Sequence, residues 1–322
     1  MPPKVLPWTD QIVLPGGGPG RVMLLAGFGS SPETLRDLGR ALQERAGATV
    51  VLSALPRHEG DESVFLRSRG WHYVREAERR FLRVWQAAQT PVHLGGYSTG
   101  ALLALLLAAR HPSKVAGLIL ISPALRLAGG DKALVAYTVG STYYLGLPLA
   151  MLGSVAAVAW HTRRGSWGRS RALLSIAGSV AVVGAAALGL RALTVPLPPG
   201  EPLRRDGADV LAPHFRRASL VGGSTLLPLQ LVARWRLRRL SLPVCLVFGE
   251  RDAVVDVRFG TLRAAENRFA ELHVVPGAPH RVSTFPTCHD IVSDFVLRTM
   301  REPGPAPRRA AEVDEPPLAE RG

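Results

Sequence analysis

One serine of this chain lies between glycines at the junction of a predicted strand and a predicted helix. The stretch Gly96-Tyr97-Ser98-Thr99-Gly100 follows the strand-like run 90–95 and precedes the run 101–110, which is almost wholly alanine and leucine. Alanine and leucine are strong helix formers. A chain that passes from strand to helix through Gly-x-Ser-x-Gly turns sharply, and glycines flank the serine because side chains would clash there. The serine hydroxyl is therefore expected at the exposed tip of the turn.

Further strand-like runs alternate with helical ones along the chain. Alternation of this kind predicts a mostly parallel sheet flanked by helices, an α/β fold. The predicted strands are residues 21–25, 49–52, 115–121, 242–249 and 271–276.

An acid and a histidine follow the last two of these strands. Asp252 comes just after the run 242–249, and His280 comes just after the run 271–276. Open parallel sheets place their sites beyond the carboxyl ends of the strands. We therefore expect Ser98, Asp252 and His280 to lie at the same edge of the sheet.

The order serine, acid, histidine in these positions resembles the α/β-hydrolase superfamily, and within it the group of carboxylesterases, monoacylglycerol lipases and serine aminopeptidases. The resemblance covers residues 21–125 and 240–300. It implies an α/β-hydrolase fold and catalysis by a nucleophile, Ser98, a base that later acts as an acid, His280, and an orienting carboxylate, Asp252. It implies neither a cofactor nor a metal.

The same resemblance assigns roles to the loop after the first buried strand. Ala26-Gly27-Phe28 stands where similar enzymes have His-Gly-x, so the backbone N–H groups of Phe28 and Thr99 are expected to form the oxyanion hole. Substrate contacts are expected at Gly27 and Tyr97. Ala26 departs from the usual histidine, which puts the substrate class in doubt rather than the chemistry.

Two of these assignments have competitors. Asp256 competes with Asp252 for the acid, but Asp252 lies nearer the end of the strand. His289 competes with His280, but it falls inside the predicted closing helix, residues 283–301.

Two other histidines suit structural roles. His93 falls within a buried strand and is expected to be a core histidine. His58 lies in a loop where relatives often carry an Arg-Gly-His-Gly-like run, and support of the site is expected there rather than a chemical role.

Composition sets outer bounds. A chain of 322 residues can bury a large core, and its two cysteines, Cys245 and Cys288, form neither a disulfide framework nor a metal-binding spacing. The first residues contain no apolar run, so no cleavable signal peptide is expected. The predicted organisation is a first core segment, an insertion, a second core segment and a disordered tail, namely residues 1–125, 126–239, 240–301 and 302–322.

The insertion has an unusual composition. Residues 133–160 and 172–190 contain no charged side chain, and each run is long enough to cross a bilayer. The basic segment 161–171 joins them. The pattern predicts a helical cap with a membrane hairpin. Because such a hairpin crosses the membrane an even number of times, both core segments that form the sheet stay on the same side of the membrane.

Two alternatives stay open for the hairpin, which are peripheral docking to a membrane and a soluble lid over an acyl pocket. Its orientation is also open. The lack of a signal sequence favours a cytoplasmic catalytic domain, whereas the four arginines of segment 161–171 would then lie outside, against the positive-inside tendency. A shallow re-entrant hairpin would remove this conflict.

Charge favours a membrane partner. The net charge is +14, and residues 126–239 hold 14 arginines and one lysine against four acidic residues. A basic rim beside apolar spans is attracted to anionic lipid. No nucleic-acid-binding motif accompanies the basic stripe 234–239, so nucleic acid is not expected as a partner. The oligomeric state cannot be deduced.

The sequence thus predicts a membrane-bound serine hydrolase that cleaves acyl esters of lipid or other small apolar molecules. A peptidase, thioesterase or acyltransferase with the same three residues is the second hypothesis. A membrane-anchored binding protein without catalysis is the third.

Overall fold

Seven strands form one sheet, which is parallel except at one edge. The computed structural model describes residues 4–55, 61–128, 138–139, 142–196, 202–205, 208–212 and 214–302. In order across the sheet, the strands are β12 (Ala270–Val275), β11 (Val244–Gly249), β6 (Val115–Ile121), β5 (Val92–Tyr97), β3 (Arg21–Leu25), β4 (Thr49–Ser53) and β2 (Gln11–Leu14).

The sheet confirms the predicted α/β class, and the predicted strands agree with the observed ones to within two residues at each end. The antiparallel edge strand β2 was not predicted. It has only four residues, and of these Ile12 and Leu14 are buried while Val13 is exposed. So short an alternation gives little signal in a sequence.

Side chains of each central strand divide between two layers of helices. Met23 and Leu25 of β3 pack in one buried cluster, and Val22 and Leu24 pack in the other, because successive side chains of a strand face opposite sides. Both faces are therefore covered, which explains why the strands read as continuous apolar runs.

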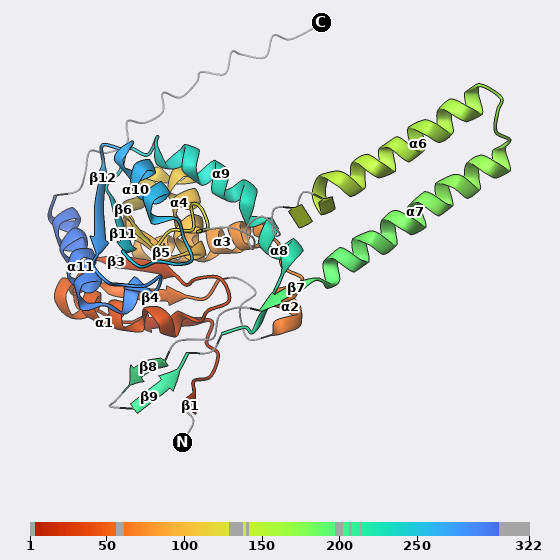
Figure 1. The fold of residues 1–322 in the computed structure, drawn as a ribbon. Helices are drawn as coiled ribbons and strands as arrows, with labels where there is room; N and C mark the ends of the chain where they lie inside the picture. Colours follow the sequence, from red (N-terminus) through yellow and green to blue (C-terminus); the bar gives the residue numbers. More distant parts are fainter. Residues whose placement is uncertain are drawn as a thin grey trace, which may run out of the picture.

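Figure 1 shows the two helical layers on either side of the sheet. The first layer consists of α3 (Gly70–Ala88), α4 (Thr99–Arg110), α9 (Leu226–Leu237) and α10 (Val257–Ala265). The second consists of α1 (Arg36–Ala46) and α11 (Pro286–Arg301).

Part of the predicted insertion, residues 126–239, belongs to the first layer. Helix α9 packs on α4, and its Ala233 and Leu237 are buried in the core. The boundaries of the insertion stay a prediction. The predicted tail, 302–322, lies outside the described residues from residue 303 onward.

Short elements lie outside the seven-stranded sheet. Small strands inside the insertion were not predicted, because two to four residues give no periodicity to recognise. These elements are α2 (Glu62–Leu66), α8 (Leu220–Ser224), β1 (Lys4–Val5) with β9 (Ala208–Leu211) and β8 (Pro202–Arg205), and β7 (Thr194–Pro196) with β10 (Arg217–Ser219).

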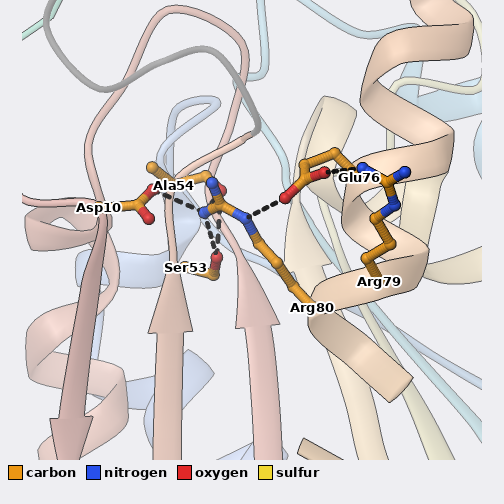
Figure 2. Close-up of polar contacts among 6 residues, drawn as sticks. All are labelled: Asp10, Ser53, Ala54, Glu76, Arg79 and Arg80. Carbon is orange, nitrogen blue, oxygen red and sulfur yellow. Dashed lines mark hydrogen bonds and ion pairs between the residues drawn. The ribbon is translucent and has the colours of Figure 1, made fainter. Parts of the chain in front are cut away.

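Arg80 ties α3 to the end of β4 (Figure 2). Its Nη1 donates to the carboxylate of Asp10 at 2.6 Å and to the hydroxyl of Ser53 at 3.0 Å. Its Nε lies 3.8 Å from Glu76 of the same helix. Only 14% of the Arg80 side chain is exposed, so these contacts are partly shielded from water and fix the helix against the carboxyl edge of the sheet.

The apolar part of the insertion forms a helical hairpin. Helices α6 (Leu147–Arg163) and α7 (Arg169–Ala192) pack against each other and project away from the sheet (Figure 1). A π-helical turn, Thr142–Gly146, precedes α6. The first predicted span, 133–160, lies partly outside the described residues, and α6 extends three residues beyond it.

One helix in the described part of the chain is long and apolar enough to cross a membrane. This segment, Ser170–Leu190 of α7, has a mean hydropathy of 2.1, and none of its most apolar window is buried in the protein.

His93 is a buried core histidine, as expected. It is 2% exposed, and its Nε2 forms a 2.7 Å hydrogen bond with Oγ1 of Thr299 in α11. Burial lowers the pKa of His93 to about 4, although a backbone hydrogen bond to Arg21 opposes the shift. His93 is therefore neutral in the folded protein at neutral pH.

We predict that His93 makes the fold sensitive to acid. Between pH 6.5 and about 4 the unfolded chain binds a proton at His93 while the folded protein does not, so stability falls as the pH drops through this window. The loss reaches about 3 kcal/mol. Thermal unfolding measured from pH 8 to pH 4 should show a shallower decline for His93→Gln than for the unchanged protein. Equal slopes would contradict the prediction.

Candidate active site

Ser98 occupies a strained turn between β5 and α4. Its φ of 55° and ψ of −114° lie outside the usual regions for a residue with a side chain. The backbone N–H of Ser98 donates to the carbonyl of Ile121 at 2.8 Å, which anchors the turn to the neighbouring strand β6. Such strain persists only where surrounding contacts impose it, and it is concentrated at functional sites.

The two glycines of the motif are required by close backbone contacts. A Cβ on Gly96 would lie 2.5 Å from the carbonyl carbon of Gly100. A Cβ on Gly100 would lie 2.2 Å from the carbonyl oxygen of Leu25 and 2.3 Å from that of Ala26. Only glycine allows α4 to start this close to the end of β3, which brings the loop after β3 against the serine turn.

Ser98, His280 and Asp252 are joined by two hydrogen bonds. Nε2 of His280 lies 3.0 Å from Oγ of Ser98, and Nδ1 of His280 lies 2.7 Å from Oδ2 of Asp252. A carboxylate can only accept, so Nδ1 donates to Asp252 and Nε2 is left to accept from the serine hydroxyl. The structure thus brings together the three residues that the sequence placed past separate strands.

Asp252 is held as a carboxylate by several donors. Its side chain is completely buried, and its Oδ1 accepts from the backbone N–H groups of Val254 at 2.8 Å and Val255 at 2.9 Å. Burial alone would raise the pKa of Asp252, but the hydrogen bond and charge of His280, together with these two N–H groups, lower it below its ordinary value.

The competing acid and histidine have other contacts. Oδ1 of Asp256 caps α10 by accepting from the N–H of Phe259 at 2.9 Å, and its Oδ2 lies 3.5 Å from Arg126. Nε2 of His289 donates to the carbonyl of Ser283 at 2.8 Å. His58 lies outside the described residues.

Tyr97 lies next to the ring of His280, and Gly27 lies next to Tyr97. The ring of Tyr97 is 5.0 Å from that of His280, and only 6% of Tyr97 is exposed. A Cβ on Gly27 would lie 2.9 Å from the Tyr97 ring. These contacts suit a support for the imidazole, and the predicted role of both residues in substrate binding stays a prediction.

Phe28 stands at the edge of an aromatic cluster. Its ring lies 5.0 Å from Phe65 of α2 and 6.1 Å from Tyr73 of α3. Phe65 in turn stacks on Phe215 at 4.2 Å. The cluster supports the loop after β3, and the oxyanion roles of Phe28 and Thr99 stay predictions.

One support for this loop was not predicted from the sequence. The backbone N–H of Phe215 donates to the carbonyl of Gly29 at 2.9 Å, and His214 forms a bridge with Ser30. Phe215 lies more than 180 residues from Gly29, within the insertion, and no motif marks it. Only the three-dimensional fold reveals that the insertion returns to support the loop after β3.

Comparison with known proteins agrees with the sheet and the serine turn. The family model Hydrolase_4 (serine aminopeptidase, S33) matches residues 68–151, which include Ser98. No curated protein matches the sequence.

Solved structures of lipolytic enzymes share the fold. One from the LipS and LipT pair of metagenome-derived lipolytic enzymes is 19% identical with a TM-score of 0.64, and the match covers 92% of this chain and 99% of that one. The monoacylglycerol lipase of Paleococcus ferrophilus is 16% identical with a TM-score of 0.63, covering 90% and 98%. A thioesterase domain from the curacin biosynthetic pathway is 15% identical with a TM-score of 0.52, covering 89% and 94%.

The chain has the α/β-hydrolase fold of these solved structures, and its residues 68–151 resemble the matched family. The predicted fold and resemblance are confirmed, and the match of residues 68–151 to a hydrolase family supports a hydrolase. At such low identity the structural likeness establishes the fold alone. In the described part of the chain, no group of three or more His, Cys, Asp or Glu side chains could hold a metal ion.

We predict that Asp252 and Asp256 respond differently to the same substitution. Asp252→Asn should lower the turnover of an ester substrate about a thousandfold or more, because an amide can donate to the imidazole and favour the wrong tautomer. Asp256→Asn should leave turnover within about twofold, because asparagine also caps a helix. Steady-state kinetics on both variants measure this, and a larger loss for Asp256→Asn would reverse the assignment.

Proposed function

We propose that this protein is a membrane-associated serine hydrolase that cleaves acyl esters of lipid or similarly apolar substrates. The observation that carries the proposal is the unbroken pair of hydrogen bonds, 3.0 Å from Ser98 to His280 and 2.7 Å from His280 to Asp252. These distances allow proton transfer without rearrangement. The buried, ionised Asp252 would stabilise the imidazolium that forms during the reaction.

The proposed reaction has two halves. As His280 takes the hydroxyl proton, Oγ of Ser98 forms a bond to the acyl carbon. The ester C–O bond then breaks, and His280 delivers the proton to the departing alcohol. In the second half, water gives a proton to His280 and attacks the acyl-enzyme. This step releases the carboxylic acid and returns the proton to Ser98.

The backbone N–H groups of Phe28 and Thr99 are proposed to bind the oxyanion of the tetrahedral intermediates. Support comes from the near-contact of Gly100 with the carbonyls of Leu25 and Ala26, which holds the two donor segments next to each other. Loss of one oxyanion donor costs roughly 3–4 kcal/mol in other hydrolases. Gly27 and Tyr97 are proposed to border the substrate through the same loop and turn.

Membrane association is supported by the exposure of the hairpin. A lid over an acyl pocket would bury its apolar side chains, but those of α6 and α7 are largely exposed. Examples are Leu149, Leu152, Leu173, Leu174, Val182 and Leu188, each at least 63% exposed. At 1.5 Å per residue, a 21-residue helix is about 31 Å long, close to the thickness of the hydrocarbon core of a bilayer.

We predict that a fluorophosphonate probe labels this protein at Ser98 and nowhere else. The probe forms a bond only with a serine activated by a base, so Ser98→Ala and His280→Ala should both abolish labelling, as measured by fluorescence after gel electrophoresis. Ser122→Ala is the matched control, since Ser122 also has a positive φ but has no histidine contact in the described structure.

Substrate assays on the same variants identify the kind of bond that is cleaved. Hydrolysis of p-nitrophenyl esters should increase with acyl chain length and disappear in Ser98→Ala. A preference for aminoacyl amides would favour the peptidase suggested by the S33 family match. Absence of labelling in the unchanged protein would leave only a binding role.

We predict that the protein remains in the membrane pellet after carbonate extraction. The double variant Val180→Arg/Val182→Arg should shift the protein to the supernatant, because each arginine near the middle of a span costs about 2.5–3.5 kcal/mol on insertion scales. Leu262→Arg, at a 61% exposed position of α10, is the matched control and should not change extraction. Release of the unchanged protein by carbonate would exclude integral insertion.

A further inference from the structure

A pocket of about 310 Å³ lies where the hairpin joins the core. Ala192, the last residue of α7, lines it together with Ser63, Leu66, Arg67 and Arg69. Figure 1 shows α2 beside the base of α7, and the pocket falls between these elements and the start of α3. The reaction proposed above uses none of these residues.

Arg69 carries a buried charge without a counter-ion in the described part of the chain. Only 7% of the residue is exposed. Its Nη1 donates to the carbonyl of Ser68 at 2.9 Å, and no carboxylate among the described residues pairs with it. A guanidinium has several further N–H donors, and burying a charge is costly unless an opposite charge accompanies it. The pocket beside Arg69 is where such a charge can be supplied.

Other charges around the pocket increase its positive potential. Arg67 is exposed at its rim. Helix α3 begins at Gly70 with no acidic residue in its first turn, so its positive end, equivalent to about half a charge, is uncompensated. The carboxyl end of α7 carries about half a negative charge, which offsets the positive end of α3. Among the described residues, neither guanidinium group forms an ion pair.

Asp61 is the acidic side chain that interacts with Arg67, but it is committed elsewhere. Its Oδ1 accepts from the N–H groups of Ser63 at 2.8 Å and Val64 at 3.2 Å, which caps α2. A side-chain hydrogen bond from Ser63 lowers the pKa of Asp61 most, the backbone bonds of Val64 and Ser63 add to this, and the charge of Arg67 contributes least. Asp61 and Arg67 form no ion pair in the described structure.

We propose that this pocket binds the phosphate group of a membrane phospholipid. Arginine presents paired N–H donors that match two oxygens of a phosphate, and such bonds are stronger than those to neutral acceptors. If the hairpin crosses the bilayer, as proposed above, its base lies at the level of the headgroups. Trp71, two residues from Arg69, is 55% exposed, as is typical of tryptophans at a membrane interface.

The test compares two phosphate sources on the delipidated full-length protein in detergent micelles. Inorganic phosphate is titrated at constant ionic strength, and separate micelles contain phosphatidylglycerol or a galactolipid that lacks phosphate. Thermal unfolding reports binding, because a ligand of the folded state raises the melting temperature. We expect phosphate and phosphatidylglycerol to raise it and the galactolipid to leave it unchanged.

Variants connect the response to the pocket. The double variant Arg67→Gln/Arg69→Gln should weaken the affinity for both phosphate ligands about tenfold or more, because it removes two charged donors. Arg236→Gln/Arg239→Gln, which removes two exposed arginines near the end of α9, is the control and should keep the response. If the first variant fails to fold, Arg67→Gln alone should still weaken binding.

Each outcome decides the matter. Equal binding by the pocket variants and the unchanged protein would overturn the proposal. It would also be overturned if neither inorganic phosphate nor phosphatidylglycerol raised the melting temperature. A response to inorganic phosphate but not to phosphatidylglycerol would support a phosphate site and refute the lipid as its source. Fluorophosphonate labelling of the same samples tests the hydrolase separately, so its failure would not be mistaken for loss of this site.

Discussion

The first turn of α4 passes so close to the end of β3 that no side chain can stand between them. Gly100 approaches the carbonyls of Leu25 and Ala26, and this contact holds Ser98 in a strained turn at the edge of the sheet. The loop after β3 is thereby fixed beside the serine. The proposed reaction depends on this contact, because it keeps the serine turn and the loop with the proposed backbone donors next to each other.

Parallel pairing supplies the other half of the site. Strands β6 and β12 flank β11, and β5 pairs with β6, all running in one direction. Their carboxyl ends therefore meet at one edge, so Asp252 and His280 arrive beside Ser98 from segments more than 150 residues away along the chain. The imidazole is then held between a buried carboxylate and the ring of Tyr97.

Three buried ionisable groups adapt to the loss of water in three different ways. His93 is buried beside Phe295, forms a hydrogen bond with Thr299 and stays neutral. Asp252 keeps its charge because N–H groups and His280 surround it. Arg69 cannot lose its proton and has a carbonyl as its hydrogen-bond acceptor in the described structure. The first residue stabilises the core, the second suits the proposed chemistry, and the third points to a ligand.

The sequence by itself determined the six parallel strands of the sheet and the three residues past their ends, because glycine spacing, apolar runs and the positions that follow them are local properties. It also identified the apolar, charge-free runs of the insertion. It could not decide whether those runs cover the site or project from it, since buried and membrane-exposed helices have the same composition. Nor could it reveal that Phe215 supports the loop of Phe28, or that Arg69 lies buried beside the base of α7. These contacts join segments that are distant in the chain and carry no motif, so only the tertiary structure, which brings them together, decided them.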